Sequence, residues 1–91
     1  MTAAESKKFC LDTVLVNHGY WSRAQFQCDI PNYSQEVMAK VKSCLNIISE
    51  SKADEVLMKG MKKFDALEKA VGHRDACDFM QFQYPGAYLL K

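Results

Sequence analysis

The chain contains four cysteines, and their spacing is the feature that most restricts its fold. Cys10, Cys28, Cys44 and Cys77 lie far apart, and none belongs to a C-x-x-C pair. Zinc ribbons and thioredoxin-like redox centres need such close pairs, whereas a small domain stapled by disulfides does not. An even count also allows every thiol to pair. The spacing therefore predicts two disulfides and an oxidising compartment outside the cytoplasm.

Length and charge narrow the class of protein further. The chain has 91 residues, of which 48% are hydrophobic, and its 12 basic and 11 acidic residues give a net charge of +1. This composition is typical of a folded domain, and the charge balance argues against nucleic-acid binding as the main role. Each disulfide would stabilise so small a domain by about 2–4 kcal/mol. We expect one domain over residues 1–91.

The start of the chain bears on its compartment. Residues 1–8 are polar and show no signal peptide, and no run reaches the roughly 18 apolar residues that a membrane span requires. We therefore expect a periplasmic or secreted protein whose leader is absent from this chain, with residues 1–8 as a disordered N-terminal tail. The alternative is a reduced cytosolic domain in which the thiols are buried or have a redox or metal role.

Hydrophobic spacing predicts helices throughout the chain, over about residues 4–18, 21–28, 34–49, 51–71 and 73–83. Gly19 and Gly72 are the expected C-terminal stops, and Ser51 is the expected cap of the fourth helix. The β-branched run Thr13–Val16 leaves a strand as an alternative in the first segment. Gly60 lies at the edge of an apolar stripe, where we expect another backbone to approach closely. The fold class is therefore all-α, a small four- or five-helix bundle.

The sequence does not decide how the cysteines pair, because four cysteines allow three pairings. A nested pattern would join Cys10 to Cys77 and Cys28 to Cys44. It would tie the two ends of the chain together and clamp the second and third predicted helices. We prefer the nested pattern for that reason.

Few side chains suggest catalysis. His73 and Cys77 are four residues apart on one predicted helix, a spacing that could activate a thiolate or contribute to a metal site. The simpler interpretation is a surface histidine beside a disulfide sulfur. The acidic residues are scattered, and the sequence has no glycine-rich phosphate loop. We predict no enzyme activity, no cofactor and no metal site.

Aromatic residues gather near both ends of the chain. Such side chains anchor protein interfaces because they bury a large area at low entropic cost. The candidates for contact with a partner are Tyr20, Trp21, Tyr84 and Tyr88. The alternative is that these rings fill the core of a small domain.

A small helical domain with one cysteine in its first helix and another near its end is similar to several exported bacterial proteins. Periplasmic acid chaperones and the immunity proteins that neutralise cell-wall-degrading toxins have this plan. Ala76-Cys77-Asp78-Phe79 is a local likeness to the immunity proteins. The second pair of cysteines departs from both plans, so no functional residue is carried over.

These observations predict an exported, non-catalytic protein that binds another protein, as an inhibitor or immunity factor. A homodimer is an additional assembly to test. The second hypothesis is a periplasmic stress or acid chaperone, which would expose apolar side chains when it loosens at low pH. The sequence does not identify the partner.

Overall fold

The computed structural model describes residues 2–88. Three consecutive segments, α1, η1 and α2, follow one another without a break and form one long first helix. The elements are α1 (Ala3–Phe9), the π-helical η1 (Cys10–Val14), α2 (Leu15–Gln27), α3 (Gln35–Leu45), α4 (Glu50–Val71) and α5 (His73–Gln83). With the first helix counted once there are four helices, and the described residues contain no strand. The predicted all-α bundle is confirmed.

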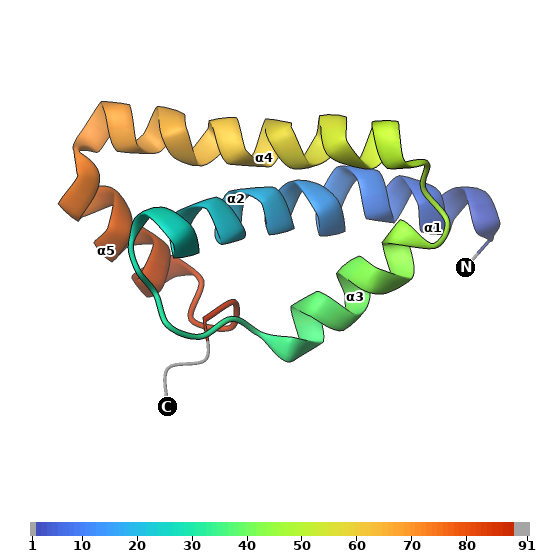
Figure 1. Cartoon of the computed structure of the whole chain (residues 1–91), viewed down its shortest axis with the longest axis horizontal. Helices are drawn as coiled ribbons and strands as arrows, with labels where there is room; N and C mark the ends of the chain where they lie inside the picture. The colour runs from blue at the N-terminus through green and yellow to red at the C-terminus, as the bar shows by residue number, and fades with distance from the viewer. Residues whose placement is uncertain (1, 89–91) are drawn as a thin grey trace.

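The first helix and α4 lie side by side and run in the same direction (Figure 1). The contacts agree with this parallel direction. Leu11 and Lys52, near the start of the two helices, line one hollow, and Arg23 pairs with Asp65 further along both helices. The chain between them returns through α3, which crosses obliquely back toward α1. The last helix, α5, turns across the far end of the pair (Figure 1). This arrangement places α3 beside the start of the first helix and α5 beside its end.

The first helix begins almost at the start of the chain. Thr2 and Glu5 form a capping box: the Glu5 N–H donates to the Thr2 hydroxyl at 3.2 Å, and the Thr2 N–H donates to the Glu5 carboxylate at 3.0 Å. The bond from the Thr2 backbone also lowers the pKa of Glu5. Residues 3–8 are therefore helical, which differs from the disordered tail expected over residues 1–8, because a cap at Thr2 starts the helix there; Met1 lies outside the described residues.

The sequence predicts that the first helix ends at Gly19, but the helix continues past it to Gln27. Gly19 is buried in the middle of α2, where its backbone lies against the backbone of Leu57 in α4. Gly60 of α4 lies in the same way against Val16 and Gly19, so the predicted close approach at Gly60 is confirmed. Tertiary packing outweighs the low helix propensity of glycine at both positions.

The run Thr13–Val16 is helical, so the strand alternative is wrong. Part of it belongs to η1, in which the Leu15 N–H donates to the Cys10 carbonyl, five residues earlier. Such a π turn inserts one extra residue into the helix and changes the direction in which the following side chains point. Here it buries both Cys10 and Val14 on the side that faces α3.

The ends of the other helices fit the sequence within a few residues. Ser34 caps α3 through a bond from the Val37 N–H at 3.2 Å, and α3 ends at Leu45. The cap of α4 is Ser49 and not Ser51. Gly72, with a positive φ of 92°, ends α4, and α5 has the predicted bounds.

Each disulfide belongs to one of two core clusters. Cys10–Cys44 joins η1 to α3 in the cluster around Leu15, and Cys28–Cys77 joins the end of α2 to α5 in the cluster around Phe64. The nested pairing of Cys10 with Cys77 and Cys28 with Cys44 is therefore wrong. The return of α3 brings its cysteine to the start of the first helix, and α5 packs at that helix's other end.

Candidate functional site

An apolar groove follows the seam between the first helix and α3. It consists of three adjoining hollows of about 520, 120 and 300 Å³. The first two share Phe9, Val14 and Lys40, and the second and third share Trp21 and Val37. We call the three hollows together the seam groove. Its remaining lining residues are Ser6, Cys10, Thr13, Asn17, Ala39, Ser43, Cys44, Ile47, Gln83, Tyr84, Pro85, Gly86 and Ala87.

The two walls of the seam groove are held together by the Cys10–Cys44 disulfide, whose residues line the first hollow. On the α3 wall, Val41 and Cys44 point into the core. Two large apolar side chains stay exposed on the rim of the first hollow, Phe9 at 46% and Ile47 at 44%. Grouped exposed apolar side chains of this kind mark interaction sites more often than isolated ones do.

Lys40 is the charged residue of the seam groove. None of the other residues that line the three hollows carries a formal charge. Lys40 lines both the first and the second hollow and is exposed to solvent where the two adjoin. An exposed positive charge beside apolar surface attracts an anionic group, and salt screens that attraction.

Two of the four predicted partner contacts, Trp21 and Tyr84, lie in the seam groove. Both are half-buried, and their ring centroids are 5.6 Å apart. The indole Nε1 of Trp21 is buried and finds no acceptor among the described residues. The indole ring is therefore not fixed by a hydrogen bond, and a change in its orientation would break none.

The other two predicted contacts, Tyr20 and Tyr88, are core residues with exposures of 4% and 0%. Their prediction as surface contacts is wrong. The Tyr88 hydroxyl donates to the Trp21 carbonyl at 2.7 Å, and burial raises the pKa of Tyr20 to about 12. Both rings are covered because α5 and the turn after it fold back over α2.

Sequence reasoning missed Phe9 and Lys40 as groove residues. Each lies at the margin of an apolar stripe, directly before Cys10 and Val41, and that position is the signal that could have identified them. The most exposed aromatic residues lie outside the seam groove, Phe26 at 75% and Phe82 at 81%.

Residues 2–88 can be compared with the alternatives of a metal site, a membrane span and a reduced thiol. There, no three His, Cys, Asp or Glu side chains gather as a metal site, and no helix is long and apolar enough to cross a membrane. All four cysteines are paired, so the reduced-thiol alternative finds no free thiol. Two disulfides fit an oxidising environment outside the cytoplasm.

No protein-family model, curated protein or solved structure matches the chain. The likeness in plan to acid chaperones and immunity proteins gains no support from these comparisons. The candidate site therefore rests on its geometry.

Proposed function

We propose that the protein is an exported, non-catalytic protein that binds an amphipathic helix of another protein in the seam groove. The observation that carries the proposal is an open apolar groove with two exposed rim residues, Phe9 and Ile47, and a single charged residue, Lys40. An inhibitor or immunity factor acts by this kind of binding and needs no catalytic group.

The walls of the seam groove favour a helix over an extended segment. The walls of the first two hollows are mainly helices, whose interior backbone N–H and C=O groups are already bonded within each helix, and the turn over residues 84–87 adds to the third hollow. An extended segment would bury its own backbone groups against side chains without partners. A bound helix satisfies its backbone internally and needs only an apolar face.

Length and charge define the partner more closely. From Ser6 to Trp21 the first helix rises about 22 Å, the length of about four helical turns. The partner helix should therefore carry apolar side chains at intervals of three and four residues over that length. It should also carry an acidic residue at the edge of its apolar face, where it meets Lys40.

Trp21 allows a direct test, because it is the sole tryptophan of the chain and lines the groove. The probe is a synthetic amphipathic peptide of about four turns, with a leucine stripe flanked by glutamates. A second peptide carries lysines in place of the glutamates. We expect the acidic peptide to shift Trp21 fluorescence and to bind about tenfold more tightly than the basic one at low salt.

Variants assign the binding to the seam groove. Lys40→Glu should reverse the preference between the two peptides, and Phe9→Ser should weaken binding. Phe82→Ser is the matched control, because it removes a more exposed phenylalanine outside the groove and should leave binding unchanged. The proposal is refuted if wild type binds the acidic and basic peptides equally and Lys40→Glu does so too. Equal losses in Phe9→Ser and Phe82→Ser would instead favour non-specific apolar binding, as the chaperone hypothesis requires.

A second copy of this chain is the competing occupant of the seam groove. Sedimentation of the unliganded protein separates the two cases. A monomer whose Trp21 responds to the acidic peptide agrees with the proposal. A dimer that Phe9→Ser dissociates would overturn it in favour of self-association.

A further inference from the structure

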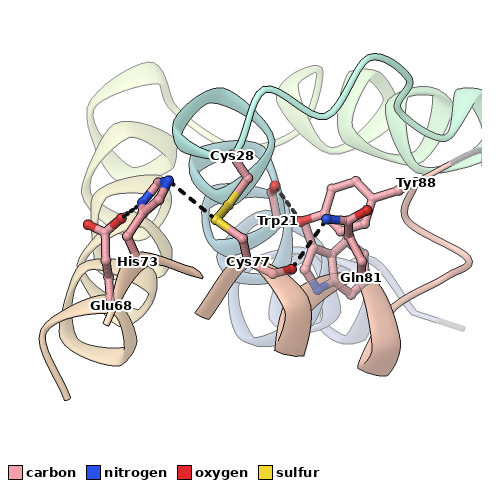
Figure 2. Close-up of a disulfide and its surroundings, with 7 residues drawn as sticks. All are labelled: Trp21, Cys28, Glu68, His73, Cys77, Gln81 and Tyr88. Carbon is pink, nitrogen blue, oxygen red and sulfur yellow. Dashed lines mark hydrogen bonds and ion pairs between the residues drawn. A yellow bond between two sulfur atoms is a disulfide. The ribbon is translucent and has the colours of Figure 1, made fainter. Parts of the chain in front are cut away.

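The Cys28–Cys77 disulfide has an ionisable pair beside it. His73, the first residue of α5, lies with its Nε2 atom 3.8 Å from the Sγ atom of Cys77. The Nδ1 atom of the same ring lies 2.5 Å from a carboxylate oxygen of Glu68, near the end of α4. Figure 2 shows the carboxylate, the imidazole and the disulfide in one line.

The two contacts place both ring nitrogens of His73 beside an acceptor. The Glu68 carboxylate accepts a hydrogen bond, so Nδ1 is the donor on that side. A disulfide sulfur carries no hydrogen and can only accept, so a bond to it needs a proton on Nε2 as well. When both ring nitrogens carry a proton, the ring can donate to the Glu68 carboxylate through Nδ1 and to the sulfur of Cys77 through Nε2.

We propose that Cys28–Cys77 is a site of thiol–disulfide exchange with a low-molecular-weight thiol, assisted by His73 and Glu68. The geometry assigns the direction of the reaction. Cys28 is half-buried, whereas Cys77 is buried at 8% exposure, so we expect the incoming thiolate to attack Cys28. The sulfur that must leave is then the one beside His73.

The reaction takes place in two steps. In the first, the thiolate sulfur forms a bond to Sγ of Cys28, and the bond between the two protein sulfurs breaks. The electron pair of that bond goes to Cys77, whose thiolate takes the Nε2 proton of His73. In the second, another thiolate attacks the sulfur of the first small molecule in the mixed disulfide, and the electron pair of the broken bond goes to Cys28, whose thiolate takes a proton from solvent. The small thiol is oxidised to its disulfide, and the protein disulfide is reduced to two thiols.

His73 touches the leaving sulfur and acts as a catalytic residue, because a sulfur whose negative charge is stabilised leaves faster. Glu68 is a positioning residue that holds the ring with Nε2 toward Cys77. The Cys10–Cys44 disulfide is a reference within the same molecule. Its cysteines are 5% and 4% exposed, and no ionisable side chain of residues 2–88 bonds to either sulfur.

The test uses reduced glutathione under native conditions, with timed alkylation and peptide mass analysis to follow each disulfide separately. We expect Cys28–Cys77 to react first, through a mixed disulfide on Cys28. His73→Gln should slow its reaction about fivefold to tenfold, while Cys10–Cys44 keeps its rate. Glu68→Gln should give a smaller loss, since an amide oxygen still accepts from the ring.

Whether His73→Gln lowers or raises the exchange rate of Cys28–Cys77 separates a catalytic role of His73 from a structural one. A variant that merely loosens the fold would expose both disulfides and speed up both reactions. Arg74→Gln is the control for charge, because it removes a neighbouring exposed cation that makes no described bond to the sulfur. The proposal is overturned if His73→Gln leaves the Cys28–Cys77 rate unchanged or raises it, if Arg74→Gln slows it equally, or if the mixed disulfide forms on Cys77.

Discussion

Gly19 of α2 and Gly60 of α4 lie against each other's helix at the point where the two helices cross. A Cβ atom on Gly19 would collide with the carbonyl of Leu57, and one on Gly60 with the carbonyl of Val16. The missing side chains let the two longest helical segments approach backbone to backbone. This contact separates the two core clusters and sets the path of both helices.

The first prediction concerns Gly60→Ala. An alanine gains about 1 kcal/mol of helix propensity, but its methyl group would force the two backbones apart at a cost of about 1–3 kcal/mol or more. Because the collision is with backbone and not with a flexible side chain, we expect a cost at the upper end of that range and a net destabilisation of up to about 2 kcal/mol in urea denaturation. Gly86→Ala is the control, since a Cβ there meets nothing within 4 Å. A Gly60→Ala variant as stable as wild type would contradict the close crossing.

The sequence allowed much of the helical pattern to be predicted, because local signals control it. The apolar stripe and Gly72 identified most of α4 and its end, and α5 has the predicted bounds. The predicted helix end at Gly19 is wrong because helix propensity is a local property, whereas the contact that keeps Gly19 helical comes from α4. The disulfide pairing failed for the same reason, since the return path of α3 is a long-range property.

The candidate site was harder to predict than the fold. Tyr88 and Trp21 are both aromatic and lie near opposite ends of the chain, and nothing in the sequence separates the core ring from the groove ring. What separates them is the turn after α5, where Ala87 accepts a bond from the Ser34 N–H at 2.8 Å and Tyr88 becomes buried. The groove itself depends on how α3 is held beside the first helix.

The second prediction concerns the hydroxyl of Tyr88. Tyr88→Phe removes the bond to the Trp21 carbonyl and leaves that acceptor without this donor, which should cost about 1–3 kcal/mol. Tyr88→Ala should cost more, about 3–5 kcal/mol, because the ring fills the core.

Burial also raises the pKa of Tyr88. The unfolded tyrosine therefore ionises first as pH rises above about 10, so wild type should lose stability there more steeply than Tyr88→Phe in denaturation series. Equal slopes would argue against a buried hydroxyl.

The third prediction concerns the two disulfides, which close loops of similar size, with sequence separations of 34 and 49. The loop-closure model gives about 4 kcal/mol for each. The double variants Cys10→Ala/Cys44→Ala and Cys28→Ala/Cys77→Ala should therefore lose similar stability in guanidinium denaturation. Paired replacement leaves no free thiol to exchange with the remaining bridge. Peptide mapping of the wild type checks the premise, and a fragment linking Cys10 to Cys77 would contradict this topology.

The fourth prediction concerns His18, which lies against Tyr33 with Nδ1 2.9 Å from the tyrosine hydroxyl and the ring centroids 5.4 Å apart. Burial lowers the pKa of His18, so the folded protein resists protonation. In the unfolded chain the histidine takes up its proton as pH falls through about 6.5. The stability that His18 contributes is therefore complete above that pH and is lost as pH falls toward the lower pKa of the folded state. We expect urea midpoints to drop between about pH 7 and pH 5 in wild type and to drop less in His18→Gln. An unchanged fall in His18→Gln would show that a different group is responsible for the acid sensitivity and that the ring of His18 is not held in a buried, neutral form.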